Sequence, residues 1–349
     1  MEMTGFDKFN GMYSYGEQTS VTRLTLSAEA QIAAYQALEG KKGTVAVYNY
    51  RTGQILCAVS TPTFDPDNLP ELNEENAAEF EGMYMSRFTD GLYTPGSIFK
   101  VLTLAVALET VPDITEQTFT CEGAVEFGPD KVTCERRHYN QDLQTAFRNS
   151  CNCAFAQIAL QVGPENLEKY AKLWGITEEL TFDGITTQKG RYKAVGQADV
   201  NVAWSGIGQF EDLINPCSFL AFIGAIANDG MATAPHVVDA ILVDEEVTYQ
   251  PQLPEGQRIL SRDTAKLLQT YLRSNVTDGY GADRFGSLPV CAKTGTAQVD
   301  GQDKPNAMLV GFSTDPDNPL AFIVCVENAG YGAEVGIPIA KQVLEACIE

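Results

Sequence analysis

Residues 93–101 read YTPGSIFKV, and this stretch says more than any other about how the chain folds. A Pro-Gly turn leads straight into an apolar run of helix length, Ser97–Leu108, which predicts a buried helix with Ser97 in its first turn. Residues three apart lie on one face of a helix. The amine of Lys100 is therefore expected close to the hydroxyl of Ser97.

This Ser-x-x-Lys spacing suits a serine nucleophile whose general base is a lysine. The lysine must be neutral to accept the serine proton, so burial or a nearby cation has to lower its pKa. Taken alone the pattern is weak, because about one such spacing is expected by chance in a chain of this length. Its position after a sharp turn, at the start of an apolar helix, sets it apart.

Two further motifs follow in order along the chain. Ser150-Cys151-Asn152 lies in Gln141–Val162, a stretch predicted to be helical, and two interpretations stay open. The serine and asparagine face solvent or cap a break in the helix, or they relay a proton to a leaving amine and hold a substrate peptide group. Lys293–Thr296 (KTGT) follows a short apolar strand. Its glycine lets backbone approach a ligand, and its lysine and hydroxyls suit a carboxylate.

The histidines offer no obvious alternative base. There are two, His138 and His236, and neither lies in a nucleophile-elbow or zinc-binding context. Both are expected to be ordinary surface or loop residues. Arg51-Thr52-Gly53 has chemistry similar to that of the third motif, but it is interpreted as the turn of a hairpin.

Composition narrows the classes of function. The 349 residues include 46 acidic and 24 basic ones, for a net charge of −22, and no Lys/Arg-rich run occurs. We therefore expect no nucleic-acid partner. The longest apolar runs, Phe219–Ala227 and Val101–Leu108, are too short to cross a bilayer, and the first residues do not resemble a signal peptide.

The nine cysteines show no zinc-like CxxC spacing. Cys151 and Cys153 alone would supply only two ligands, so neither a metal nor a cofactor is expected. Cys121 and Cys134 bracket a polar, Gly-containing stretch that is interpreted as a hairpin. A disulfide across it is geometrically allowed, and two free thiols are an equally good interpretation.

The pattern of elements predicts an α+β fold. An antiparallel sheet built from both chain ends and flanked by helices fits it, with a mostly helical subdomain inserted at about residues 101–230. Residues 1–23 are interpreted as a lead-in and residues 24–349 as the domain proper. The predicted strands are 43–50, 54–60, 289–292, 307–312 and 320–326, and the other predicted helices are 24–38, 165–174, 216–228, 261–274 and 337–348.

In the order S-x-x-K, S-x-N and K-T-G, the three motifs resemble those of the penicillin-binding transpeptidases, in the serine β-lactamase and transpeptidase superfamily. The resemblance covers most of the chain from about Leu24 onward and includes RTGQILCAVSTPTFDPDN, SCNCAFAQIA, CAKTGTAQV and VENAGYG. It is nearest to class B, the monofunctional transpeptidases, which usually carry an N-terminal membrane anchor and a pedestal domain. Residues 1–23 would then be the remnant of that region. Ser205–Gln209 resembles a Gly-Gln turn of the family, with Phe210 where a glycine is common.

The resemblance implies a β-lactamase/transpeptidase-like fold and a D,D-transpeptidase that cross-links peptidoglycan stem peptides ending in D-Ala-D-Ala. Ser97 would attack the carbonyl between the two D-alanines with Lys100 as general base, and β-lactams would acylate the same serine. The backbone N–H groups of Ser97 and Thr296 would form the oxyanion hole. Ser150, helped by Lys293, would pass a proton to the departing D-alanine.

The resemblance also implies how the substrate is held and where the enzyme works. Asn152 would hold the peptide, while Thr294 and Thr296, with Gly295 between them, would bind the terminal carboxylate. The implied location is the extracytoplasmic face of the bacterial membrane, with the chain anchored by a helix that precedes it. The implied partners are stem peptides, β-lactams as covalent inhibitors, and a cell-wall synthesis complex with an enzyme such as a glycosyltransferase.

Three other activities go with similar motifs. A D,D-carboxypeptidase differs only in passing the acyl group to water. A class A β-lactamase needs a carboxylate base in an E-x-x-L-N loop, whereas Thr177–Thr181 has threonine at both deciding positions. A non-catalytic β-lactam sensor tends to lack the S-x-N motif, which this chain has.

Overall fold

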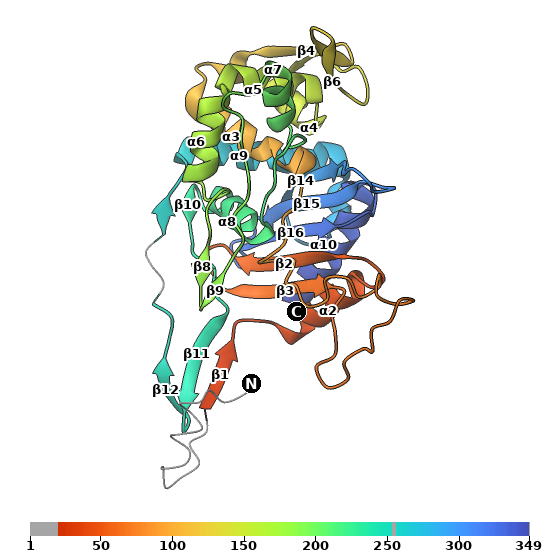
Figure 1. The fold of residues 1–349 in the computed structure, drawn as a ribbon. Helices are drawn as coiled ribbons and strands as arrows, with labels where there is room; N and C mark the ends of the chain where they lie inside the picture. Colours follow the sequence, from red (N-terminus) through yellow and green to blue (C-terminus); the bar gives the residue numbers. More distant parts are fainter. Residues whose placement is uncertain (1–19, 253–255, 349) are drawn as a thin grey trace.

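The computed structural model describes residues 20–252 and 256–348, and a five-stranded antiparallel sheet lies at its centre (Figure 1). The strand order is β14-β15-β16-β2-β3. Because β16 pairs with β2, the two ends of the chain build one sheet, and the predicted α+β fold is confirmed. The strands are β2 (Gly43–Asn49), β3 (Ile55–Thr61), β14 (Val290–Ala297), β15 (Asn306–Ser313) and β16 (Leu320–Val326).

Helices cover both faces of this sheet, which explains why its strands are almost continuously apolar. Successive side chains alternate along a strand. In β2, Val45 and Val47 therefore pack in one core and Ala46 and Tyr48 in the other. The first core lies under α2 (Ala28–Ala37) and α10 (Gly332–Ile348).

The predicted hairpin and first helix are confirmed with small changes. Arg51-Thr52-Gly53 forms the turn between β2 and β3, where Gly53 has a φ of 82°. The first helix begins at Ala28, within the predicted range 24–38, because the Ser27 hydroxyl caps it by accepting the Ala30 N–H.

The opposite face of the sheet packs against α8 (Pro216–Ala227), which lies so close that one position must be glycine. A Cβ at Gly224 would lie 1.6 Å from the hydroxyl of Tyr48, which projects from β2. The next helix on this side is α9 (Arg262–Asn275), which packs on α8 and β14. The predicted subdomain at 101–230 therefore extends too far, because α8 packs on β15 and β16.

The remaining helices form a separate layer above the end of the sheet that carries β14 (Figure 1). One predicted helix, Gln141–Val162, is wrong as a single element. Residues 139–142 form a strand, and the helix breaks at Ser150, whose φ of 50° lies in the left-handed region. This layer contains α3 (Lys100–Thr110), α4 (Leu143–Arg148), α5 (Asn152–Val162), α6 (Pro164–Leu173) and α7 (Asp199–Ser205), with the strand pairs β4–β7 (Thr118–Cys121, Tyr139–Asp142) and β5–β6 (Ala124–Phe127, Asp130–Thr133).

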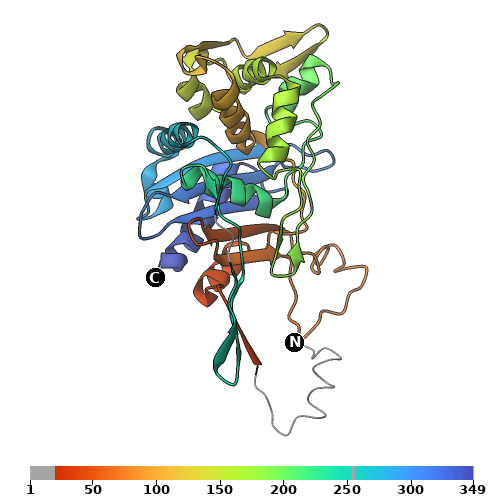
Figure 2. The same cartoon turned by 90° about the vertical axis from the view of Figure 1, so that its left-hand side faces the viewer.

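A three-stranded sheet projects from the far end of the molecule (Figures 1 and 2). It consists of β1 (Ser20–Leu24), β11 (Val238–Val243) and β12 (Glu246–Tyr249). The predicted lead-in, residues 1–23, is thus wrong for its last four residues, while residues 1–19 lie outside the described part. Most side chains of β1 are exposed, so the strand has no alternating apolar pattern to mark it. The remaining short strand pairs are β8–β9 (Thr181–Phe182, Ile185–Thr186) and β10–β13 (Met231–Ala232, Gln257–Arg258).

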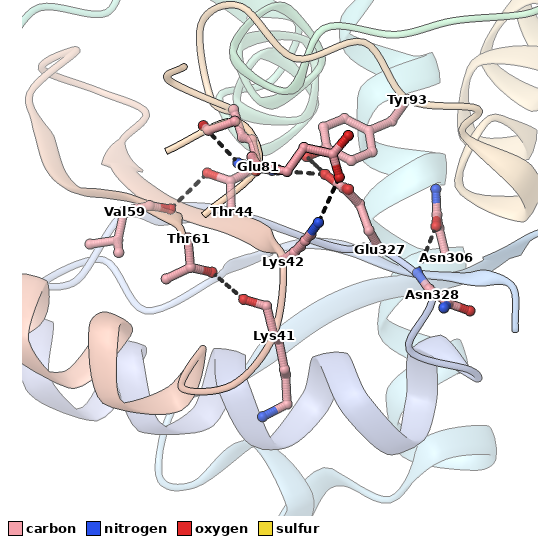
Figure 3. A network of polar contacts seen from close by, with 12 residues as sticks. Lys41, Lys42, Thr44, Val59, Thr61, Glu81, Tyr93, Asn306, Glu327 and Asn328 are labelled. Carbon is pink, nitrogen blue, oxygen red and sulfur yellow. Dashed lines mark hydrogen bonds and ion pairs between the residues drawn. The ribbon is translucent and has the colours of Figure 1, made fainter. Parts of the chain in front are cut away.

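The long segment between β3 and the nucleophile turn is anchored to the sheet. The buried guanidinium of Arg87 donates from Nε to a Glu327 carboxylate oxygen at 2.8 Å, and the Tyr93 hydroxyl donates to the same oxygen at 3.1 Å (Figure 3). Lys42 and Glu81 add an ion pair at 2.8 Å. In the described residues, no helix has the length and apolar character needed to cross a bilayer.

Candidate active site

Ser97 lies in a tight turn pressed against strand β14. The segment Gly96–Ile98 is a 3-10 turn that leads directly into α3, as expected for a nucleophile at a helix start. Gly96 has a φ of 54°, and a Cβ there would lie 2.8 Å from the backbone oxygen of Thr296. The Gly96 N–H donates to the Gly208 carbonyl at 2.9 Å. Glycine therefore permits the close approach of this turn to the edge strand.

Lys100 lies at the centre of the polar contacts. Its Nζ has no exposed surface and lies 3.1 Å from Ser97 Oγ, 2.7 Å from Asn152 Oδ1 and 2.6 Å from the Ser150 carbonyl oxygen. Burial lowers the pKa of Lys100 to about 8, against the opposing pull of the Cys134 and other nearby thiols. A substantial neutral fraction therefore exists near neutral pH, and this fraction can accept a proton from Ser97.

Ser150 joins Lys100 to the second buried lysine. Its Oγ lies 3.2 Å from Lys100 Nζ and 2.9 Å from Lys293 Nζ. Burial, and after it the charge of Lys100, hold the pKa of Lys293 well below its usual value. The left-handed φ of Ser150 arises where α4 ends and α5 begins, with Cys151 as the cap of α5. Such strain outside a regular element is a feature of functional sites.

The third motif lies on β14, which is an edge strand of the central sheet. Both the N–H and the hydroxyl of Thr294 donate to the Tyr280 hydroxyl at 3.1 Å. Desolvation raises the pKa of Tyr280, so its hydroxyl stays protonated. A Cβ at Gly295 would lie 3.0 Å from the Ile98 nitrogen, so this glycine lets the edge strand pass the nucleophile turn.

A cleft of about 610 Å³ opens over these groups. The side chains of Lys100 and Lys293 are buried beneath it, close to the hydroxyls that line it. The described residues that line the cleft include the predicted Ser97, Ser150, Asn152, Thr294, Gly295 and Thr296, together with Glu135, Trp204, Gln209, Gln298 and Tyr331. The cleft is thus bordered by an edge strand on one side and the Ser150–Asn152 segment on the other, which suits an extended peptide.

A cluster of sulfur and imidazole ligands includes Cys151 of the Ser150–Asn152 segment, and two of its members, Cys134 and His138, line the cleft. The ligand atoms of Cys121, Cys134, His138 and Cys151 all lie within 4.8 Å of one another. His138 Nδ1 lies 3.5 Å from Cys134 Sγ and 3.6 Å from Cys121 Sγ. Three thiolates and one imidazole form a tetrahedral ligand set that Zn²⁺ prefers, so these residues can hold a metal.

This cluster corrects one expectation from the sequence, because His138 is part of it rather than an ordinary surface or loop histidine. His236 lies in the connection between β10 and β11, as expected of a loop histidine, and its side chain is buried. Sequence spacing indicates no metal site, because the ligands come from three segments that folding brings together. Cys121 and Cys134 are both free thiols. Their sulfur atoms lie within 4.8 Å of each other and within 4.8 Å of the Cys151 sulfur.

Comparison with known proteins identifies the family. The profile described as "Penicillin binding protein transpeptidase domain" matches residues 43–345. The chain belongs to this family. It is 26% identical over 363 residues to the peptidoglycan D,D-transpeptidase PbpA of Mycolicibacterium smegmatis, covering 93% of this chain and 72% of the relative. It is 28% identical over 358 residues to stage V sporulation protein D of Bacillus subtilis, covering 92% and 52% respectively.

Solved structures agree with this assignment. The ceftriaxone acyl-enzyme complex of penicillin-binding protein A from M. tuberculosis superposes with a TM-score of 0.84 at 23% identity, covering 99% of this chain and 83% of that one. The D,D-transpeptidase domain of a peptidoglycan glycosyltransferase from Eggerthella lenta also gives 0.84, at 26% identity, covering 99% and 87%. The predicted fold class and family are therefore confirmed.

Several residues near the cleft of this penicillin-binding transpeptidase domain could not be predicted from the three sequence motifs. Tyr280 follows α9 in a short turn, and Trp204 lies in the last turn of α7, so neither lies in a motif. Gln209 and Tyr331 do lie in segments that resemble the family, SGIGQ and VENAGYG. The resemblance to the family is the sequence feature that could have indicated Gln209 and Tyr331 as cleft residues, because no local pattern around them does so.

Proposed function

We propose that this transpeptidase-family chain is a peptidoglycan D,D-transpeptidase that works through an acyl-enzyme on Ser97. The observation that carries the proposal is the Lys100 amine, which is buried, has a pKa lowered to about 8 and lies 3.1 Å from Ser97 Oγ. A lysine in that state is a general base for the serine. The names of the relatives, peptidoglycan D,D-transpeptidases among them, support the same activity.

In the acylation step, Ser97 Oγ attacks the carbonyl carbon between the last two D-alanines while Lys100 takes its proton. The carbonyl oxygen becomes an oxyanion, for which the backbone N–H groups of Ser97 and Thr296 are the proposed donors. One such donor contributes about 3 kcal/mol to the stability of the transition state. The close contact between the Gly96 turn and the Thr296 backbone supports this pairing, because it brings the two peptide groups together.

Collapse of the intermediate breaks the peptide bond, and the departing nitrogen needs a proton. Ser150 donates its hydroxyl proton to that nitrogen and regains one from Lys100, which lies 3.2 Å away and received the Ser97 proton. Lys293, at 2.9 Å from Ser150 Oγ, stabilises the negative charge that develops on this oxygen. The products are the acyl-enzyme and free D-alanine. An amine of a neighbouring stem peptide then attacks the ester and restores Ser97.

The rest of the cleft binds the substrate. The Nδ2 of Asn152 donates to the Thr133 carbonyl at 2.8 Å, which orients the side chain along the cleft wall where it holds the donor peptide. On β14, Thr294, Gly295 and Thr296 bind the terminal carboxylate, with the Thr294 hydroxyl oriented by its bond to a neighbouring tyrosine. The edge strand adds backbone hydrogen bonds to an extended stem peptide.

The proposal extends to location and partners. Peptidoglycan lies outside the cytoplasmic membrane, so the enzyme works on the outer face of that membrane and is anchored by a segment that precedes the domain. A glycosyltransferase that makes the glycan strands is the proposed partner, because it supplies the stem peptides that this enzyme cross-links.

We also propose that Zn²⁺ binds to Cys121, Cys134, His138 and Cys151 and supports this site. Cys151 lies between Ser150 and Asn152, and Cys134 follows the residue whose carbonyl holds Asn152, so the ion would tie these segments together. Its role is a structural cross-link, since four protein ligands leave no open position. Ligation through Nδ1 puts the His138 proton on Nε2, so Arg136, whose Nε lies 3.2 Å from that atom, must turn away.

Intact-mass spectrometry after incubation with benzylpenicillin tests the proposed nucleophile. The wild-type protein should gain one lasting adduct per chain and the Ser97→Ala variant none. A D-Ala-D-Ala peptide with and without an acceptor amine then distinguishes cross-linking from carboxypeptidase activity. Rapid loss of the adduct would indicate a β-lactamase instead, and a folded wild-type protein without an adduct would contradict the proposal.

Elemental analysis tests the metal proposal separately. The purified protein should carry one Zn²⁺ per chain, and Cys134→Ser should lose it. Cys57→Ser is the matched control, because Cys57 is a buried free thiol in the central sheet outside the cluster. Equal zinc content in all three proteins, or none in the wild type after growth in zinc, would contradict the site.

A further inference from the structure

A loop from the helical layer braces the nucleophile turn through backbone contacts. This brace segment, Ser205–Ile214, accepts the Gly96 N–H at the Gly208 carbonyl (2.9 Å) and the Thr103 hydroxyl at its Gly206 carbonyl (2.7 Å). A Cβ at Gly208 would lie 2.4 Å from the Gly96 oxygen. The two backbones are therefore in direct contact, and a shift in one must move the other.

The far end of the brace segment holds the chain that enters the turn. Ile214 and Tyr93 exchange two backbone hydrogen bonds, each of 2.9 Å. Leu213 is in turn paired with Arg191 through hydrogen bonds of 2.7 and 2.8 Å. The brace segment thus contacts both the entry to the nucleophile turn, at Tyr93, and the turn itself, at Gly96.

One side-chain contact closes the brace segment across its middle. The Ser205 hydroxyl donates to Asp212 Oδ1 at 3.3 Å, and both residues are almost fully buried. In the described part of the chain, Asp212 Oδ2 and the hydroxyl of Tyr192 have no hydrogen-bond partner. The Tyr192 ring stacks on Phe99, between the nucleophile and its base in sequence, with centroids 5.1 Å apart.

Burial favours the neutral form of the Asp212 carboxyl. Burial raises the pKa of Asp212 well above its usual value, and the Ser205 hydroxyl acts in the opposite direction. The nearest guanidinium, Arg191, donates from Nε to the backbone carbonyl of Glu211 at 2.9 Å instead of pairing with the acid. A neutral acid can both accept from the serine and donate, as a protonated carboxyl does.

We propose that Asp212 is a positioning residue for acyl transfer: its hydrogen bond to Ser205 keeps the brace segment closed on the turn that carries Ser97. The inference rests on the proposed function for its kinetic readout. Neither residue belongs to the three motifs, and neither is among the described residues that line the cleft. Their contribution is to keep Ser97 Oγ at hydrogen-bond distance from the Lys100 amine. Such positioning matters for the rate, because a misplacement of about 1 Å can slow a reaction about a hundredfold.

If the Ser205–Asp212 hydrogen bond only stabilises the fold, different results are expected. A structural role can therefore be distinguished from a positioning role. Asp212→Leu removes one partner of a buried hydrogen bond and leaves the Ser205 hydroxyl unpaired, so it should lower the melting temperature. If the pair only stabilises the fold, the acylation rate of the folded variant would stay unchanged. A positioning role predicts that Asp212→Leu and Ser205→Ala both slow acylation, while Asp212→Asn, which keeps neutral hydrogen bonding, restores it.

Stopped-flow acylation by a chromogenic cephalosporin measures this directly. Asp212→Leu and Ser205→Ala should lower the first-order acylation constant by about ten- to a hundredfold without changing the non-covalent binding constant. Asp212→Asn should stay within about threefold of the wild type. Ser218→Ala is the matched control, because Ser218 Oγ is buried without a hydrogen-bond partner in the described part of the chain and belongs to α8, outside the brace segment. Wild-type acylation in Asp212→Leu would overturn the proposal, as would a loss in Asp212→Asn equal to that in Asp212→Leu.

Amide hydrogen exchange of the peptide spanning residues 93–100 provides a readout without turnover. Exchange should be faster in Asp212→Leu and Ser205→Ala than in the wild type, and unchanged in Asp212→Asn and Ser218→Ala. Equal exchange in all five proteins would overturn the positioning role even if the kinetics differed. If the wild type itself is not acylated, the proposed function fails, and the exchange experiment still decides whether Asp212 closes the brace segment.

Discussion

Acylation of Ser97 is expected to become faster as the pH rises, because the base that activates it must be neutral. Lys100 Nζ is buried 3.1 Å from the serine oxygen, and burial lowers its pKa to about 8. The thiols of Cys134 and Cys151 and the carboxylate of Glu135 act in the opposite direction and favour the charged form. The neutral form increases as the pH passes through this value from below, so the rate must rise and not fall.

The size of the effect follows from a single titration. With a pKa of about 8, about 3% of the lysine is neutral at about pH 6.5 and about 76% at about pH 8.5. If acylation requires the neutral amine, its rate constant rises about 25-fold over this interval. An unperturbed lysine would instead give a rise of nearly a hundredfold with no sign of a plateau, since its titration lies above the whole interval.

The assay is the second-order rate constant for acylation by benzylpenicillin, measured at several pH values with the enzyme shown to stay folded. The curve should bend toward a plateau near its upper end. Lys100→Met, which removes the base, should leave a much smaller rate that varies little with pH. A wild-type rate that is constant or falls between about pH 6.5 and 8.5 would refute the assignment of Lys100 as a base that titrates near 8.

Three further changes test the contacts around this site. Gly96→Ala should slow acylation about ten- to a hundredfold, because its Cβ would lie 2.8 Å from a backbone oxygen of β14; wild-type kinetics would contradict that contact. Lys293→Met should slow acylation about a hundredfold through the lost bond to Ser150 but leave the mass of the final adduct unchanged; a full rate would remove the lysine from the relay. Arg87→Met should lower the free energy of unfolding by about 3 kcal/mol, because the guanidinium is buried against Glu327; an unchanged denaturation midpoint would show that the pair adds nothing.

The arrangement of the active site explains why two lysines can lie so close together. Lys100 and Lys293 each contact the Ser150 hydroxyl, and both are fully buried. Two ammonium groups that share one buried site repel each other, so the pair holds fewer than two protons near neutral pH. The Ser150 hydroxyl then lies between two amines with different proposed roles. Lys100 accepts a proton and passes one to Ser150, and Lys293 stabilises the charge on the Ser150 oxygen. This arrangement requires both lysines, the serine and a dry interior.

The sequence by itself determined the central sheet, the order of its elements and the three motifs. Continuously apolar strands such as 320–326 and the apolar helix after Ser97 are local patterns, and burial of their apolar side chains leaves few other folds. The side-chain spacing of Ser97 and Lys100 also follows from helix geometry alone. These features can be predicted from the sequence because the physical cause of each involves residues that are close together in the chain.

Only the tertiary structure decided how the motifs meet and what supports them. The helix predicted across 141–162 breaks at Ser150, whose left-handed backbone is held by contacts with both buried lysines. The cysteine and histidine cluster and the Tyr280 hydroxyl join residues from separate segments, and the brace segment contacts the Gly96 turn from a distant part of the chain. Such contacts produce no periodicity and no motif spacing in the sequence, because the residues that contact each other come together only when the whole domain packs.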